Sequence, residues 1–390
     1  MKSKLFLYSF VFLFILFFSS CLIYLPYPGG STPTQDDPYY EEDYRDSSSR
    51  YDTSYFYDYL APHGTWVYNA PHGYVWIPQV YRYGWRPYSN GNWVWSDFGW
   101  TWISDWDWGW IPFHYGRWDW DNYLGWYWVP DSIWGPAWVT WRRSSLYIGW
   151  APIPPGTRFI SGIGIRTVPR GLSGRHWIFV EYPNFYRTQI YRNMLPLERN
   201  QTIISYTIHK TNIVQQGNRI INQGIEKEYL QNRVEKPIIK HVLKDARTPM
   251  KSVVKVDELQ VFRPNIEKNE KAKPKTVVER ETVRDSRTET KIKRASSGSQ
   301  LAVDPVLKEN QKREMTVLKR SQEEEITMIR KKREDERKNA KSSAEKAEIE
   351  KKAQIEIGTL LKKHKTEEGR LKERHKKEET SFKRVIKKKK

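Results

Sequence analysis

A short aromatic phrase that returns about every 26 residues constrains the fold of this chain more than any other feature. The phrase Gly-x-x-Trp places its tryptophan at Trp76, Trp102 and Trp128. A shorter phrase, Gly-x-Trp, precedes each copy and supplies Trp66, Trp93 and Trp118. Two phrases that recur together indicate an internal structural repeat. The repeat is shorter than the roughly 40 residues of a propeller blade, so we expect another β architecture.

The residues within each repeat alternate with a period of two, which is typical of β-strands. Turn residues separate the strands. Asn90-Gly91 is a strong hairpin signal, and Gly99 supplies a left-handed turn position in the next connection. A fourth, less regular unit completes the series. We therefore expect a mainly β N-terminal half, with an antiparallel meander at residues 61–155 that is curled or barrel-like and contains three to four Trp-rich repeats.

The tryptophans of the repeat are also candidates for ligand binding, because aromatic faces beside Asp and Arg can stack sugar rings. The candidate ligand-binding aromatics are Trp66, Trp76, Trp93, Trp102, Trp118 and Trp128. The alternative is that these side chains form the core, since their regularity follows the strand pattern. Eighteen of the nineteen tryptophans lie between residues 66 and 150. This number exceeds the needs of so small a core, so we expect some indoles to be exposed.

Six phrases carry a family resemblance: GTWVY at 64–68, GWRPY at 84–88, WTWISD at 100–105, HYGRW at 114–118, GPAWV at 135–139 and IGWAP at 148–152. They resemble a Trp-rich repeat domain of exported bacterial proteins whose function is unknown. The resemblance covers about residues 61–155 and continues more weakly beyond residue 175. It implies no established activity, cofactor or catalytic residue.

The N-terminus has the layout of an export signal, with two lysines, an apolar stretch and small residues before Cys21. The segment Phe-Ser-Ser-Cys that ends at Cys21 resembles the lipobox of bacterial lipoproteins. This resemblance implies removal of residues 1–20 and a lipid on the Cys21 sulfur that anchors the chain in a membrane. Leu22, the residue after the anchor, favours the outer membrane by analogy with enteric bacteria. The alternative is an uncleaved helix, because Leu5 to Leu25 is long enough to span a bilayer.

Composition divides the rest of the chain into segments. Residues 21–60 are rich in Pro, Gly, Ser, Asp and Tyr and predict a flexible tether, whose tyrosines allow its end to dock on the aromatic domain. Residues 156–246 predict a β-rich extension, with a hairpin turn at 216–218 and one or two helical turns at 225–233. Residues 247–300 are polar, basic and without a period, so they predict a disordered linker.

The C-terminal segment, residues 301–390, predicts a long charged α-helical tail, because Lys, Arg, Glu, Gln and Ala dominate it. It contains 29 basic and 18 acidic residues, so it carries more than half of the net charge of +20. Apolar residues are too sparse for consecutive heptads, which favours a solvated helix or a weak oligomeric coiled coil. Its charge favours anionic polymers or lipid head groups, and the helix also offers a contact for a protein partner.

Residues for catalysis or metal binding do not form a known pattern. His63, His72 and His114 lack the spacing of a metal site, and turns account for the first two. Six aspartates between Asp97 and Asp131 offer carboxylates for a glycosidase, but β-turns already explain their positions. We therefore expect no enzyme, catalytic residue, cofactor or metal. Nucleic-acid binding is disfavoured because the chain is exported and its cations and aromatics lie in separate segments.

The sequence thus predicts an exported, membrane-anchored lipoprotein of the bacterial cell envelope with a non-enzymatic binding role. In this hypothesis the aromatic β-domain engages an envelope glycan or protein. The basic arm contacts an anionic surface such as peptidoglycan, lipopolysaccharide or phospholipid. A structural spacer that links membrane to cell wall is the alternative, and a glycan hydrolase is a more distant one.

Overall fold

The computed structural model describes residues 51–80, 84–165, 169–234, 236–283 and 300–387. All of these residues belong to one compact unit. The predicted signal peptide, Cys21 and the tether up to residue 50 lie outside the described residues. None of the helices in the described ranges is long and apolar enough to cross a membrane.

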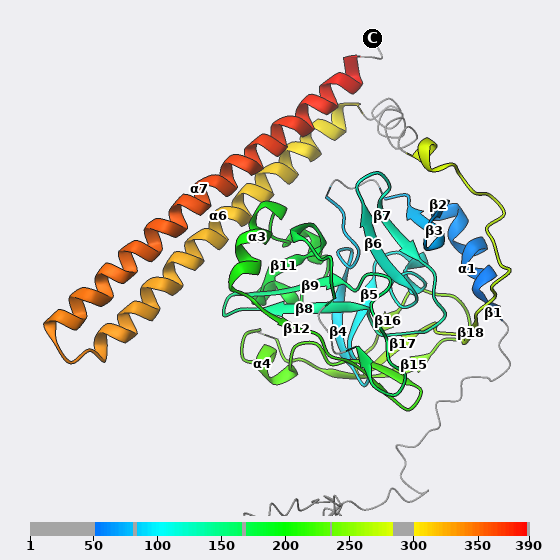
Figure 1. Ribbon diagram of the computed structural model, residues 1–390, viewed down its shortest axis with the longest axis horizontal. Coiled ribbons are helices and arrows are strands. Elements are labelled where there is room, and N and C mark those ends of the chain that lie inside the picture. The colour runs from blue at the N-terminus through cyan, green and yellow to red at the C-terminus, as the bar shows by residue number, and fades with distance from the viewer. Residues whose placement is uncertain (1–50, 81–83, 166–168, 235, 284–299, 388–390) are drawn as a thin grey trace, which may run out of the picture. The chain divides into compact units, whose positions relative to one another are not determined.

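Four antiparallel hairpins form the aromatic domain (Figure 1). Their strands are β2 (Gly64–Asn69) with β3 (Gly73–Pro78), β4 (Gly91–Ser96) with β5 (Gly99–Ser104), β6 (Arg117–Asp121) with β7 (Gly125–Val129), and β8 (Val139–Arg143) with β9 (Tyr147–Pro152). The mainly β N-terminal half is confirmed. Gly73, Gly99 and Gly125 start the second strands with φ of 75°, 75° and 74°, because the preceding turns need a left-handed residue. Asn90-Gly91 leads into β4 and closes no hairpin, so that turn prediction is wrong.

The hairpins are distributed over three sheets instead of following one another around a single curled sheet. The strand orders are β2-β3-β7-β6, β11 (Ile178–Glu181)-β9-β8-β12 (Ile208–Lys210), and β10 (Gly164–Ile165)-β13-β14-β5-β4-β15-β17-β16. Indoles from different sheets pack together: the ring centroids of Trp93 in β4 and Trp141 in β8 are 4.6 Å apart. The core therefore lies between the sheets and is shared by all the hairpins.

The segment after residue 156 completes these sheets. The predicted hairpin with a turn at 216–218 is confirmed as β13 (Ile213–Gln216) and β14 (Arg219–Asn222), and the predicted helical turns as α4 (Lys227–Gln231). Residues just before β12 form the helix α3 (Leu197–Tyr206). The other short elements are α2 (Tyr182–Phe185), η1 (Ala61–His63), η2 (Asp107–Trp110), η3 (Gly174–His176) and η4 (Ile190–Arg192).

The ordered chain extends further at both ends than the sequence boundaries predict. Beyond β15 (Lys240–Asp245), the start of the predicted linker forms β16 (Val253–Val254), β17 (Glu258–Val261) and β18 (Ile266–Glu267). Its apolar residues, such as Leu259 and Phe262, are buried in the shared core, and this burial explains the order. Residues 284–299 lie outside the described ranges.

The end of the predicted tether docks on the aromatic domain, as its tyrosines suggest. β1 (Tyr51–Asp52) pairs in parallel with β18, and α1 (Thr53–Leu60) follows it. Asp52 caps α1 by accepting a hydrogen bond from the backbone N–H of Ser54 at 2.7 Å. Phe56 and Leu60 on this helix are fully buried. The described fold therefore includes residues 51–60 of the predicted tether.

The tail is helical, as predicted, but it folds back on itself (Figure 1). α6 (Gln300–Lys338) and α7 (Ser343–Lys387) lie antiparallel and side by side. The Ser342 hydroxyl accepts a hydrogen bond from the Glu345 N–H at 3.1 Å, and the Glu345 carboxylate accepts one from the Lys341 N–H. This local capping starts a second helix and explains why a single continuous helix does not form.

Candidate functional site

The six candidate ligand-binding tryptophans form three cross-strand pairs in the core. Trp66 lies opposite Trp76, Trp93 opposite Trp102, and Trp118 opposite Trp128. All six side chains are at most 2% exposed. They present no face to a ligand, and the structure places them where the core interpretation expects them. Sixteen of the nineteen tryptophans are buried and the other three are half-buried, so solvent reaches far fewer indoles than their number suggests.

The glycine of each Gly-x-Trp phrase makes room for the indole of its partner strand. A Cβ on Gly64 would lie 2.4 Å from Trp76 Nε1, and a Cβ on Gly116 would lie 2.7 Å from Trp128 Nε1. Both distances are shorter than real contacts allow. The repeat therefore combines glycine and tryptophan because the indole of one strand occupies the space beside the glycine of the other.

Backbone carbonyls satisfy most of these buried indole N–H groups. Trp66 donates to Tyr57, Trp76 to Leu60, Trp118 to Pro112 and Trp128 to Tyr115, at 2.7 to 3.1 Å. Two of the acceptors lie on α1, so the helix both covers the aromatic core and fixes its polar atoms. These contacts give the tryptophans a structural role in a rigid scaffold.

Three tryptophans, Trp95, Trp106 and Trp120, remain half-buried. Trp120 lies on β6, the edge strand of its sheet. The Arg175 Cζ atom lies over its ring, 4.6 Å from the centroid, and Trp126 meets it edge-on at 5.6 Å. Arg175 belongs to η3, far away in the sequence. Because Trp118 and Trp120 share one face of the strand pattern, periodicity alone could not separate the buried indole from the accessible one.

The candidate histidines and aspartates have structural partners. His114 is buried, with Nδ1 3.0 Å from the Gly135 carbonyl oxygen, and burial lowers its pKa to about 4. The Asp121 carboxylate accepts hydrogen bonds from the backbone N–H groups of Tyr123 and Leu124. Asp121 thus fixes the β6–β7 turn, as expected. Within the described ranges, no three His, Cys, Asp or Glu side chains form a group that could hold a metal ion.

A buried ionic cluster joins the helical hairpin to the β-domain. Arg199 of α3 is fully buried; its Nη2 lies 2.6 Å from Glu325 of α6 and its Nη1 lies 2.9 Å from Glu367 of α7. His364 Nε2 lies 2.8 Å from Glu325. Burial alone would raise the pKa of Glu325, but the hydrogen bond with His364 and the charge of Arg199 hold it below its usual value.

Other contacts extend this interface. Arg374 of α7 binds Glu198 of α3 at 2.7 Å and Glu314 of α6 at 3.0 Å. Val317 of α6 enters an apolar cluster with Tyr147 and Trp177 of the β-domain. The sequence does not predict this interface, because an isolated arginine in α3 carries no motif and burial of the glutamates in the charged tail is visible only in the structure.

About half of the acidic residues of the hairpin are covered, whereas nearly all of its basic residues are exposed. Of the 23 lysines and arginines in residues 307–380, 20 are exposed. Of the 17 acidic residues in the same range, 9 are buried or half-buried. The surface of the hairpin is therefore more basic than its composition, and Arg199, Arg374 and His364 bind several of the covered acids.

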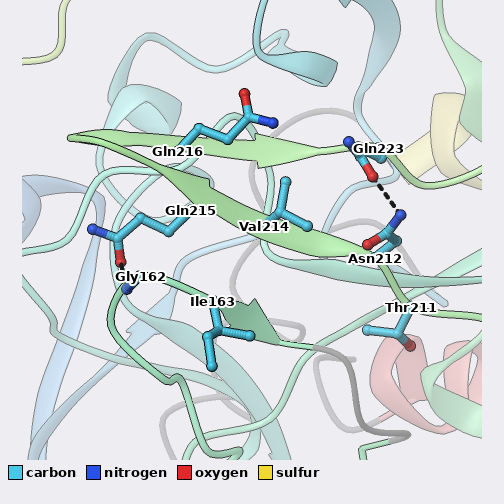
Figure 2. Close-up of a pocket in the computed structure, with 8 residues that line it drawn as sticks. All are labelled: Gly162, Ile163, Thr211, Asn212, Val214, Gln215, Gln216 and Gln223. Carbon is cyan, nitrogen blue, oxygen red and sulfur yellow. Dashed lines mark hydrogen bonds between the residues drawn. The ribbon is translucent and has the colours of Figure 1, made fainter. Parts of the chain in front are cut away.

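A polar groove of about 500 Å3 lies at the β10–β13–β14 end of the large sheet (Figure 2). Three of its four side-chain amides, those of Asn212, Gln215 and Gln223, are bonded within the chain. Gln215 Oε1 accepts a hydrogen bond from the Gly162 N–H at 2.9 Å, and the Asn212 and Gln223 side chains bond to each other. These contacts tie the loop before β10 to the hairpin, so the groove has a structural explanation.

The geometry defines a β-repeat domain with a tryptophan core and a docked helical hairpin. Residues 57–157 match the model of a family of unknown function (DUF6600). The match runs from the end of α1 to the residues just after β9, so it coincides with the four hairpins. No curated protein and no solved structure matches the chain.

Proposed function

We propose that this chain is an exported envelope lipoprotein, anchored in a membrane through Cys21, with a non-enzymatic binding role. Its β-domain acts as a rigid scaffold that holds the helical hairpin. The exposed cations of the hairpin bind an anionic envelope polymer, of which peptidoglycan is the candidate we name. The unequal exposure of basic and acidic residues in α6 and α7 carries this proposal.

Charge segregation matters because a helix with evenly mixed charges attracts an anionic polymer only weakly. Residues 307–380 present 20 exposed cations and only 8 exposed acidic side chains. Such a surface attracts a polyanion at low ionic strength, and salt screens the attraction because the Debye length falls from about 10 Å at 0.1 M to about 3 Å at 1 M.

The buried cluster around Arg199 supports a scaffold role for the β-domain. It fixes both helices of the hairpin to α3, so the cations are held on a defined surface instead of a free arm. Pre-organisation of this kind reduces the entropy cost of binding.

The folded-back tail favours a binding role over a spacer. The 45 residues of α7 extend for roughly 70 Å at 1.5 Å per residue, about half of what the whole tail would span as one helix. Because α7 runs back along α6, the second helix adds binding surface but does not increase the distance that the tail can span. The same polymer contact remains compatible with attachment of the membrane to the cell wall.

The test is retention of the purified full chain on insoluble peptidoglycan at low and high salt. One variant changes four exposed hairpin lysines to glutamate: Lys331, Lys332, Lys351 and Lys352. The control makes the same change in net charge on the β-domain: Lys236, Lys240, Lys271 and Lys273. We expect the hairpin variant to lose at least tenfold in retention at low salt and the control to lose much less. Equal retention of the two variants would contradict the proposal.

A further inference from the structure

We propose that the edge of β6 at Trp120 is a binding subsite for a neutral pyranose ring of a glycan. This site lies on the aromatic domain, and its residues are separate from those of the helical hairpin. It extends the envelope role proposed above, but its recognition rests on stacking and hydrogen bonds instead of charge. The juxtaposition of an accessible indole with polar side chains from η3 and the β6–β7 turn carries the inference.

The aromatic component of the site is well fixed. Trp120 is half-buried on an edge strand, so part of its indole reaches solvent. Trp126 supports it edge-on, with an interplanar angle of 74°. Arg175 covers one face of the ring, so a sugar packs its C–H face against the part of the indole that remains exposed. Because the indole is held in one orientation, this contact costs little side-chain freedom.

The polar component surrounds this ring. Trp120 Nε1 lies 3.4 Å from the Asn122 side-chain oxygen, and the exposed Arg175 guanidinium lies over the indole. The Asp119 side chain is 28% exposed. Amide, guanidinium and carboxylate groups together offer both donors and acceptors, which vicinal hydroxyls require.

Two hydrogen bonds hold the Asp119 carboxylate at this edge. Its Oδ1 accepts the backbone N–H of Trp120 at 2.7 Å, and its Oδ2 accepts the Tyr127 hydroxyl at 3.3 Å. His176 Nε2 lies 3.8 Å from Oδ1, beyond hydrogen-bond distance. Two donors therefore position the carboxylate, and lone pairs remain for a ligand hydroxyl.

The other half-buried tryptophans lack this setting. Trp95 belongs to β4, an interior strand between β5 and β15. The Trp106 ring stacks on Trp108 at 5.4 Å, and its N–H is buried without a hydrogen-bond partner among the described residues. Among these three indoles, Trp120 alone combines an edge strand with surrounding polar side chains.

The experiment measures retention of the full chain on insoluble peptidoglycan at about 1 M salt, where charge contacts are screened. Soluble N-acetylglucosamine tetramer serves as the competitor. We expect wild-type retention that the tetramer reverses, and at least a fivefold loss in Trp120→Ala and in Arg175→Ala. The matched controls are Trp95→Ala, also half-buried, and Arg187→Ala, also exposed.

Arg175→Ala decides the outcome if Trp120→Ala impairs folding, because the Arg175 side chain is exposed. Absence of retention at 1 M salt would overturn the subsite, as would retention of both site variants at the level of their controls. Low-salt retention through the hairpin is measured in the same samples. A failure of the glycan subsite is thereby distinguished from a failure of the proposed hairpin surface.

Discussion

Replacement of Gly116 by alanine tests whether the indole of the partner strand dictates the glycine of the repeat. The φ of Gly116 is 63°, and alanine in this left-handed region costs about 1–2 kcal/mol. The new Cβ would also lie 2.2 Å from the Val129 carbonyl oxygen and 2.7 Å from Trp128 Nε1. Overpacking of a core adds about 1–3 kcal/mol. We therefore expect a total loss of about 2–5 kcal/mol in the free energy of unfolding.

Gly73→Ala is the matched control. Its φ of 75° imposes a similar backbone cost, but no heavy atom lies within 4 Å of the added Cβ. The control should lose only about 1–2 kcal/mol. Urea unfolding, followed by tryptophan fluorescence, measures both values. Equal losses in the two variants would refute the argument that the Trp128 indole excludes a side chain at Gly116.

Two further predictions concern the docking of the helical hairpin and the lipid anchor. Arg199→Gln leaves Glu325 and Glu367 buried without their cation, so docking of the hairpin should weaken by about 3–5 kcal/mol. Hydrogen exchange of the α6 and α7 amides measures this loss. The control Lys338→Gln removes an exposed ion pair and should change the exchange little. Equal protection of these amides in both variants contradicts the docking role of Arg199. Metabolic labelling with a fatty acid should mark the wild-type chain and not Cys21→Ser, and an unlabelled wild type rules out the anchor.

Local patterns in the sequence predicted the hairpins, because alternation and turn glycines act over a few residues. Their distribution among sheets could not be predicted in this way. The contact between Trp93 and Trp141 joins residues from different hairpins, and no local signal specifies it. The strands after residue 247 could not be predicted either. Apolar residues such as Leu259 and Phe262 are too few there to indicate strands, and they become buried only because the core formed by the earlier segments covers them.

The helical tail was predictable from composition, whereas its fold was not. A heptad pattern requires an apolar contact between helices, but much of the contact between α6 and α7 is polar. Gln322 donates a hydrogen bond to the backbone oxygen of His364, and Arg333 pairs with Glu356 at 2.7 Å. The sequence also could not predict the setting of Trp120, because the guanidinium over its ring belongs to Arg175, on a later segment of the chain.

The long separation between Arg199 and Glu367 has a consequence for the order in which the protein is made. These residues are 168 positions apart. A ribosome that adds about 5–20 residues per second needs roughly 10–30 s to pass from one to the other. Until Glu325 is added, the residues of the four hairpins already exist while Arg199, which the fold buries completely, lacks both of its counter-charges. Glu367 of α7 is the later of the two to be made, so the complete charge balance around Arg199 requires the second helix of the hairpin.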